Sequence, residues 1–291
     1  MRGPGPRPMP EFFSGSLRCD LCPRRCDISE GKSGRCGVRQ NRGGEPFLPR
    51  YGFITAMAMD PIEKKPLYHF RPGSSILSIG FSGCNLHCPF CQNWRISQNS
   101  EAPGRVMNTD EIINTVLGSG NLQIAYTYSE PLIHIEFLLD CMKKAREAGI
   151  ANVLVTNGCI NTEAAEKILA LTDAANIDLK CFSEKTYAEI LGGNLQTVLD
   201  FIRLAHKTKV HVEVTTLVVP GLNDSEAELD GCADFIAGLG PPEIPWHLTA
   251  YHPDYRWKAP PTDPAALMDA AHRARQKLKY VYTGNIGLTR F

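Results

Sequence analysis

The stretch Gly83-Cys84-Asn85-Leu86-His87-Cys88-Pro89-Phe90-Cys91-Gln92-Asn93-Trp94 comes shortly after an apolar run at Ser75–Gly80, and together they decide the fold class. A short apolar run of this kind is typical of a strand that is buried on both faces of a parallel sheet. Three cysteines with the spacing C-x3-C-x2-C follow it. In parallel α/β barrels, the residues that carry the chemistry follow the carboxyl ends of the strands. We therefore expect Cys84, Cys88 and Cys91 to lie at a catalytic mouth.

The chain after this run alternates short apolar stretches with amphipathic helical patterns, which is typical of βα units around a parallel sheet. Further strands are expected at 122–127, 151–156, 175–180, 210–219 and 244–251. Helix starts are indicated by Asn108 with Glu111, by Ser225 with Glu228, and by Asp263 before Pro264. The sequence thus predicts an α/β fold, namely a partial (βα)6 TIM-like barrel at 73–291 after a small Cys-rich module at 1–72.

The N-terminal module carries four cysteines, with little periodic apolar pattern around them. They are Cys19, Cys22, Cys26 and Cys36. Four thiolates satisfy a tetrahedral zinc ion, and metal binding would supply the folding energy that this segment lacks. We expect a separate closed site, with zinc as its metal, that shapes this module and does not touch a cofactor bound at the barrel mouth. An auxiliary iron-sulfur cluster is the alternative, because four cysteines also suit a cube.

Composition limits the classes of function. The chain has 291 residues, is 43% hydrophobic, and balances 31 basic against 31 acidic residues, so it can bury a large core and has no overall charge for nucleic acid or an acidic membrane. Met1 to Pro10 lacks the apolar run of a secretory signal, and no stretch is long and apolar enough to span a membrane. We therefore expect a cytoplasmic protein, in which clustered cysteines bind metal instead of forming disulfides.

The three cysteines of the loop favour an iron-sulfur cluster. A cube held by three cysteines leaves one iron open for a ligand, whereas structural zinc takes four closed ligands. The alternative is a zinc site that is completed by His87 or by a distant cysteine. The position of the loop after the first strand favours catalysis, and Phe90 offers an apolar face on which a planar ring could stack.

The C-x3-C-x-aromatic-C motif after the first strand of a six-unit barrel resembles the radical S-adenosylmethionine (SAM) superfamily. The resemblance implies that Cys84, Cys88 and Cys91 hold a 4Fe-4S cluster and that SAM chelates its open iron. It also implies that the reduced cluster cleaves SAM to a 5'-deoxyadenosyl radical, which abstracts hydrogen from the substrate. Two further segments are similar to the radical enzyme of the AmmeMemoRadiSam system, which is related to pyruvate formate-lyase-activating enzymes. They are Asp60-Pro61-Ile62-Glu63-Lys64-Lys65-Pro66-Leu67-Tyr68-His69-Phe70 and Tyr280-Val281-Tyr282-Thr283-Gly284-Asn285.

This resemblance implies further cofactor-binding residues at the ends of the strands. Glu130, with Ser129 beside it, stands where the family has a Gly-Gly-Glu motif; the alternative is a solvated carboxylate before a helix. Asp178 and Lys180 point to the same side of a strand, either to bind the cofactor or as a structural ion pair. The remaining candidates for cofactor binding are Phe90, Gln92, Asn157 and His252.

The function that this resemblance implies is hydrogen abstraction from a protein or small-molecule substrate. Activation of a glycyl radical enzyme competes with modification of an associated Memo- or AMMECR-type protein. A flavodoxin or ferredoxin would serve as electron donor. Two other classes remain open at this point. One is a non-catalytic zinc-binding adaptor. The other is RNA binding through the basic N-terminal segment, although the balanced charge leads us to expect no nucleic acid.

Overall fold

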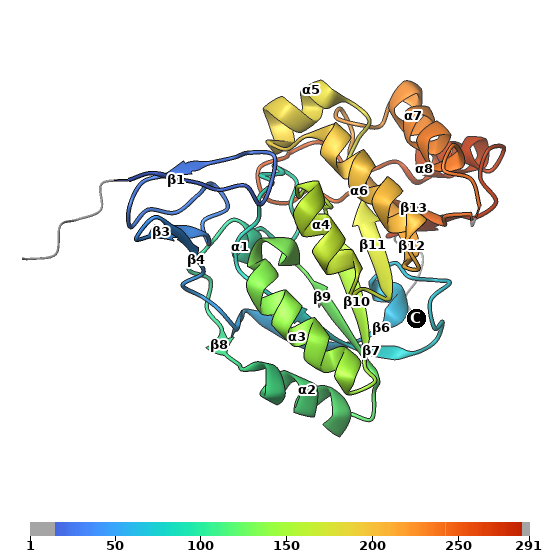
Figure 1. The fold of residues 1–291 in the computed structure, drawn as a ribbon. Coiled ribbons are helices and arrows are strands. Elements are labelled where there is room, and N and C mark those ends of the chain that lie inside the picture. Colours follow the sequence, from blue (N-terminus) through green and yellow to red (C-terminus); the bar gives the residue numbers. More distant parts are fainter. Residues whose placement is uncertain (1–14, 242, 287–291) are drawn as a thin grey trace, which may run out of the picture.

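One sheet of eight strands forms the centre of the molecule (Figure 1), and its order is β14-β13-β12-β11-β10-β9-β7-β6. This computed structural model describes residues 15–241 and 243–286, so the expectations for Met1 to Pro10 lie outside the described residues. The strands are β6 (Ala56–Pro61), β7 (Ser75–Gly80), β9 (Gln123–Thr127), β10 (Ala151–Thr156), β11 (Ala174–Asp178), β12 (His211–Val218), β13 (Trp246–Ala250) and β14 (Val281–Gly284).

The strands from β7 to β14 pair in parallel, and the predicted α/β class with a parallel barrel-like sheet is confirmed. All six expected strands are present within a few residues of their predicted bounds. The sheet is larger than predicted at both edges. β14 adds a seventh parallel strand, and β6 pairs with β7 in antiparallel register, with Ala56 opposite Gly80. The division of the chain at residue 72, which remains a proposal, falls between two paired strands.

Helices cover the outer face of the sheet (Figure 1). The helices of the described residues are α1 (Trp94–Ser97), α2 (Thr109–Gly118), α3 (Ile135–Glu147), α4 (Thr162–Leu169), α5 (Glu184–Thr186), α6 (Leu195–Lys207), α7 (Glu226–Ala237) and α8 (Pro264–Ala274), with short turns η1 (Ile62–Lys64), η2 (Pro131–His134) and η3 (Tyr187–Leu191). The predicted starts are confirmed. Asn108 forms a capping box with Glu111, while Ser225 and Asp263 accept hydrogen bonds as N-caps.

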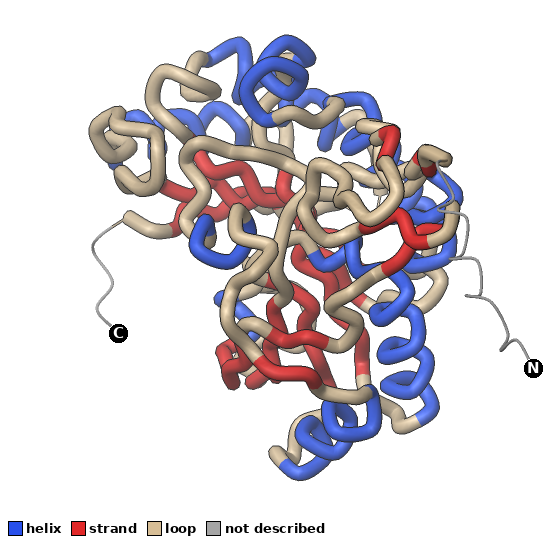
Figure 2. Tube along the Cα trace, turned by 90° about the vertical axis from the view of Figure 1, so that its left-hand side faces the viewer, coloured by secondary structure: helices blue, strands red, loops and turns tan. Residues whose placement is uncertain are grey.

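Alternation along the strands separates two apolar layers. Leu77 and Ile79 of β7 belong to the main core with helix residues such as Phe137, whereas Ile76 faces the inside of the barrel with Ala125. Figure 2 shows the strands in the centre, helices around them and long loops crossing in front. None of the helices in the described residues is long and apolar enough to cross a membrane.

The N-terminal module consists of short hairpins and turns beside the barrel (Figure 1). β1 (Leu17–Arg18) pairs with β2 (Asp27–Ile28), and β3 (Gln40–Arg42) pairs with β4 (Glu45–Phe47). β5 (Phe53–Ile54) pairs with β8 (Arg105–Val106). Such short strands bury little apolar surface by themselves, so the module depends on other contacts for its order.

Candidate functional site

The cysteine loop leaves the carboxyl end of β7 and runs into α1, as the sequence predicts. Cys88 is buried, while Cys84 and Cys91 are partly exposed. The amide of Cys91 donates to the carbonyl of Cys88 at 3.2 Å, which closes a turn between the second and third cysteines. All three therefore sit in one short loop at the mouth of the barrel.

Polar groups surround the sulfurs of this loop. The amide of Leu86 donates to Sγ of Cys84 at 3.3 Å, and Nδ2 of Asn157 lies 3.7 Å from the same sulfur. The hydroxyl of Ser97 lies 3.1 Å from Sγ of Cys91. Burial raises the pKa of the Cys88 thiol to about 12, and the ammonium group of Lys180 acts in the opposite direction. Donors and a cation around three sulfurs fit an anionic cluster bound by thiolates.

The loop is not arranged around a single ion. Among the described residues, no group of three or more His, Cys, Asp or Glu side chains could hold one metal ion. Nδ1 of His87 instead pairs with Oε1 of Gln98 at 2.9 Å. A cube binds each cysteine at a different iron, so its sulfurs lie farther apart than the ligands of one zinc ion. The donor set therefore fits a cluster better than a zinc ion completed by His87.

Glu130 follows β9 and is almost completely buried, with 1% of its surface exposed. Its carboxylate accepts hydrogen bonds from the amide of Leu132 at 3.0 Å, the hydroxyl of Thr156 at 2.7 Å and the amide of Asn157 at 2.8 Å. Burial raises its pKa to about 7, although these three donors act to lower it. Glu130 is therefore no solvated carboxylate. It joins the end of β9 to the end of β10, and a cofactor ammonium would be a further partner.

Two asparagines connect the cysteine loop to the end of β10. Nδ2 of Asn157 donates to Oδ1 of Asn85 at 2.9 Å, and Nδ2 of Asn85 donates to the carbonyl of Cys159 at 2.7 Å. The hydroxyl of Ser129 donates to the carbonyl of Phe81 at 2.8 Å, at the start of the same loop. We did not predict a role for Asn85. Its place between the first two cysteines is the only signal in the sequence.

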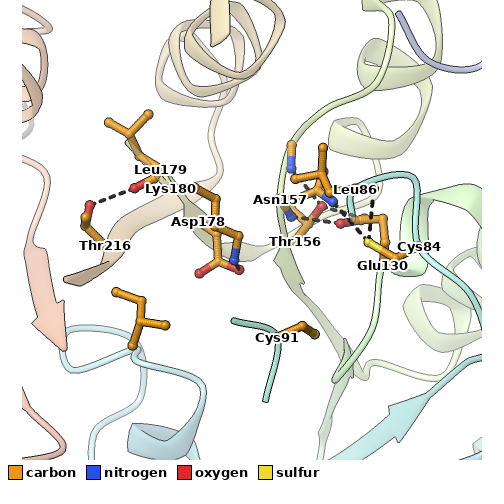
Figure 3. A network of polar contacts seen from close by, with 12 residues as sticks. Cys84, Leu86, Cys91, Glu130, Thr156, Asn157, Asp178, Leu179, Lys180 and Thr216 are labelled. Carbon is orange, nitrogen blue, oxygen red and sulfur yellow. Dashed lines mark hydrogen bonds and ion pairs between the residues drawn. The ribbon is translucent and has the colours of Figure 1, made fainter. Parts of the chain in front are cut away.

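Asp178 and Lys180 form an ion pair at the end of β11, with 2.8 Å between Oδ2 and Nζ. Both side chains are partly exposed at the mouth. Burial acts to lower the pKa of Lys180. The pKa is nevertheless raised above its ordinary value, because the Asp178 carboxylate and the sulfurs of Cys88 and Cys91 favour the charged form. Figure 3 shows this pair on one side of the mouth and Cys84 with Glu130 on the other.

The other predicted residues make no hydrogen bond to the groups described so far. The ring of Phe90 is packed into the main core, with 3% of its surface exposed. Gln92 is exposed to solvent. His252 is exposed as well, and its Nε2 lies 3.2 Å from the carbonyl of Asn285. Cofactor contacts by these three residues remain predictions.

The loop after β13 also reaches the cysteine loop. The amides of Arg256 and Trp257 both donate to the carbonyl of Pro89, at 2.8 and 2.9 Å. The rings of Trp94 and Tyr255 are stacked with 5.2 Å between their centroids. These contacts fix the position of the segment between Cys88 and Cys91. No pattern in the sequence predicts these contacts, because the partners are about 160 residues apart.

Comparisons with known proteins agree with this geometry. The family model of the radical SAM superfamily matches residues 78–231. An uncharacterised protein of Methanocaldococcus jannaschii is 39% identical over 274 residues, which cover 93% of this chain and 81% of the relative. A pyruvate formate-lyase-activating enzyme of Staphylococcus epidermidis is 26% identical over 198 residues, which cover 60% of this chain and 75% of that enzyme.

Two solved structures share the fold. Streptococcus suis SuiB bound to S-adenosylmethionine has a TM-score of 0.57 at 15% identity, covering 74% of this chain and 54% of that chain. QueE of Escherichia coli has a TM-score of 0.51 at 14% identity, covering 79% of this chain and 92% of that chain. At these identities the likeness concerns the fold alone.

The chain belongs to the radical SAM superfamily. It is an enzyme of that superfamily and is related to pyruvate formate-lyase-activating enzymes. Membership implies a 4Fe-4S cluster, SAM and a reductant.

Proposed function

We propose that the protein holds its 4Fe-4S cluster at Cys84, Cys88 and Cys91, and that it abstracts hydrogen from a protein or small-molecule substrate. The observation that carries the proposal is the three-cysteine loop at the barrel mouth, with hydrogen-bond donors beside two of its sulfurs. When it is bound and reduced, the cluster supplies the electron that cleaves SAM into methionine and a 5'-deoxyadenosyl radical.

The residues around the mouth orient the cofactor in this proposal. Glu130 holds the amide of Asn157, and Asn157 in turn holds Asn85 beside the first cysteine. Asp178 and Lys180 offer one negative and one positive group at the mouth, opposite Cys84. These charges can bind the ammonium, carboxylate or ribose of SAM through charge-assisted hydrogen bonds. Glu130, Asp178 and Lys180 therefore act in binding and positioning.

Among the possible substrates, we propose a glycyl radical enzyme. The names of the relatives support this choice, since several are pyruvate formate-lyase-activating enzymes and one is a putative glycyl-radical enzyme activating enzyme. Modification of a Memo- or AMMECR-type partner is the second candidate. A cytoplasmic flavodoxin or ferredoxin would supply the electron.

A spectroscopic experiment tests the assignment of the cluster. The reconstituted, reduced protein should give an electron paramagnetic resonance signal of a four-iron cluster that changes when SAM is added. Cys88→Ala should lose the SAM-responsive signal. Cys141→Ala is the matched control, because Cys141 is a buried cysteine of α3 in the main core. A response to SAM that persists after all three loop cysteines are replaced by Ala would contradict the assignment.

The substrate needs a separate test. With a peptide that carries deuterated glycine, activation of a glycyl radical enzyme predicts deuterium in the 5'-deoxyadenosine product. The same assay with a deuterated Memo- or AMMECR-type protein tests the second candidate. Deuterium transfer from that protein, and none from the glycine-labelled peptide, would favour it.

A further inference from the structure

The four N-terminal cysteines come together around one small cavity. Its lining includes Cys19, Cys22, Cys26 and Cys36, together with Arg24 and Asn85. All four cysteines are partly buried. The amide of Cys19 donates to the carbonyl of Cys26 at 2.9 Å, which closes the loop that carries the first three. Four thiols around one cavity form a set of metal ligands.

The arrangement of these thiols distinguishes between a zinc ion and a cube. Around zinc, with Zn–S bonds of about 2.3 Å, tetrahedral geometry brings the sulfurs to about 3.8 Å from one another and leaves no space between them. No His, Cys, Asp or Glu group in the described parts of the chain converges in this way. The four thiols line one cavity without converging on a single point, and a cube likewise takes each cysteine at a different iron.

Positive charge accompanies the site. Arg24 lines the cavity, and so does Arg39, which is buried and bound to Glu136 through two hydrogen bonds of 2.7 and 2.8 Å. Glu136 compensates the charge of Arg39, and Arg24 adds a further positive charge at the cavity. A guanidinium group beside the site stabilises the negative charge that four thiolates bring to a bound cluster.

The loop of the radical cluster forms one wall of this cavity. Asn85, the residue after Cys84, lines the cavity, and Nε of Arg24 donates to its carbonyl at 3.1 Å. Gly83 packs against the N-terminal module so closely that a Cβ there would lie 2.6 Å from the carbonyl oxygen of Cys36. Cys84 thus directly follows a residue in contact with Cys36. The N-terminal cysteines therefore lie next to the cysteine loop at the barrel mouth.

We propose that Cys19, Cys22, Cys26 and Cys36 bind a second 4Fe-4S cluster, and that this cluster relays electrons to the radical cluster. One electron from a one-electron donor protein reduces the N-terminal cluster. The same electron then passes to the radical cluster, so the N-terminal cluster returns to its oxidised state and no bond forms or breaks at it. The presence of the cluster is independent of the proposed function, whereas the relay rests on it.

Metal analysis of the full chain tests the site. In a variant with Cys84, Cys88 and Cys91 all replaced by Ala, we expect about four irons per chain and almost no zinc. One zinc per chain, or no metal at all, would overturn the second cluster. Because this variant keeps the N-terminal cysteines, the result does not depend on radical chemistry.

The relay has its own test, which compares two reductants. With a flavodoxin or ferredoxin as donor, Cys22→Ala should form 5'-deoxyadenosine at least about tenfold more slowly than the wild type. With dithionite, which can reduce the radical cluster directly, the two rates should agree within about twofold. The dithionite arm also shows that the variant is folded. An equal loss with both reductants, or no loss with either, would overturn the relay. Magnetic coupling between two reduced clusters should appear in the wild type and vanish in Cys22→Ala.

Discussion

Nδ2 of Asn157 donates a 2.9 Å hydrogen bond to Oδ1 of Asn85 and so joins the end of β10 to the cysteine loop. Asn157 itself is held by the carboxylate of Glu130. Both asparagine side chains are buried, with 2% of Asn85 and 5% of Asn157 exposed. The loop that carries the three cysteines is therefore positioned by buried polar side chains at the ends of the neighbouring strands β9 and β10.

Replacing Asn85 by Ala should loosen this loop. The substitution leaves the buried amide of Asn157 and the carbonyl of Cys159 without their partner, which costs about 1–3 kcal/mol. We expect urea unfolding at a lower midpoint and faster loss of iron to a chelator. Asn114→Ala, on the exposed face of α2, serves as the matched control and should change neither. Wild-type iron retention in Asn85→Ala would contradict the role given to these hydrogen bonds.

Glu130→Gln should affect stability and cofactor binding together. The carboxylate accepts three hydrogen bonds in a buried site. In Gln, an NH2 group takes the place of one carboxylate oxygen, and this group cannot accept the hydrogen bonds that the oxygen accepts. A loss of about 2 kcal/mol of unfolding free energy is expected, with weaker SAM binding in a titration followed by spectroscopy. The exposed Glu147→Gln is the control. Unchanged SAM affinity would leave Glu130 with a structural role alone.

The pair of Asp178 and Lys180 allows a test between cofactor binding and a structural ion pair. Lys180→Met leaves the Asp178 carboxylate without its cation and should weaken SAM binding by at least about tenfold. Asp178→Asn combined with Lys180→Met removes both charges. If the pair is only structural, the double variant should regain stability and SAM affinity, because no unpaired charge is left. We expect SAM affinity to remain low, as measured by equilibrium binding.

The opposite end of the barrel gives a prediction about pH. Glu213 is completely buried, and burial alone would raise its pKa. Its carboxylate, however, accepts hydrogen bonds from His211, from His247 and from the amides of Tyr68 and His69. These hydrogen bonds lower its pKa to about 2. Because the folded pKa lies below the ordinary value of 4.5, this stabilisation is present above pH 4.5 and is lost as the pH falls toward 2.

Glu213→Gln should therefore lower the unfolding free energy by about 3 kcal/mol near neutral pH. The difference from the wild type should shrink as the pH is lowered from about 4.5 to about 2.5. Urea unfolding of both proteins at several pH values measures it. A difference that stays constant over this range would show that the charge of Glu213 does not contribute.

The sequence predicted the parallel strands well because each one is a short apolar run between helical patterns. It did not predict β6 and β14 at the edges. β6 contains Asp60 and Pro61, and β14 has only four residues, so neither resembles a buried strand. The pairing of β6 with β7 is visible only once the loop between them folds back.

The part of the candidate site that could be predicted consists of residues close to one another in the sequence. Cys84, Cys88 and Cys91 are close in sequence, so their spacing alone indicates a shared ligand. Contacts such as those of Asn85 with Cys159, or of Pro89 with Arg256, join distant parts of the chain and depend on the tertiary fold. Phe90 belongs to the main core in the structure, and a contact between its ring and the cofactor remains a prediction.

The most direct test of the proposed chemistry is the formation of 5'-deoxyadenosine by the reconstituted protein, reduced with dithionite under anaerobic conditions and mixed with SAM. We predict slow formation of 5'-deoxyadenosine and methionine in equal amounts by the wild type and by Cys141→Ala, and none by Cys88→Ala. A wild-type protein with a full, reduced cluster that forms no 5'-deoxyadenosine would contradict the account.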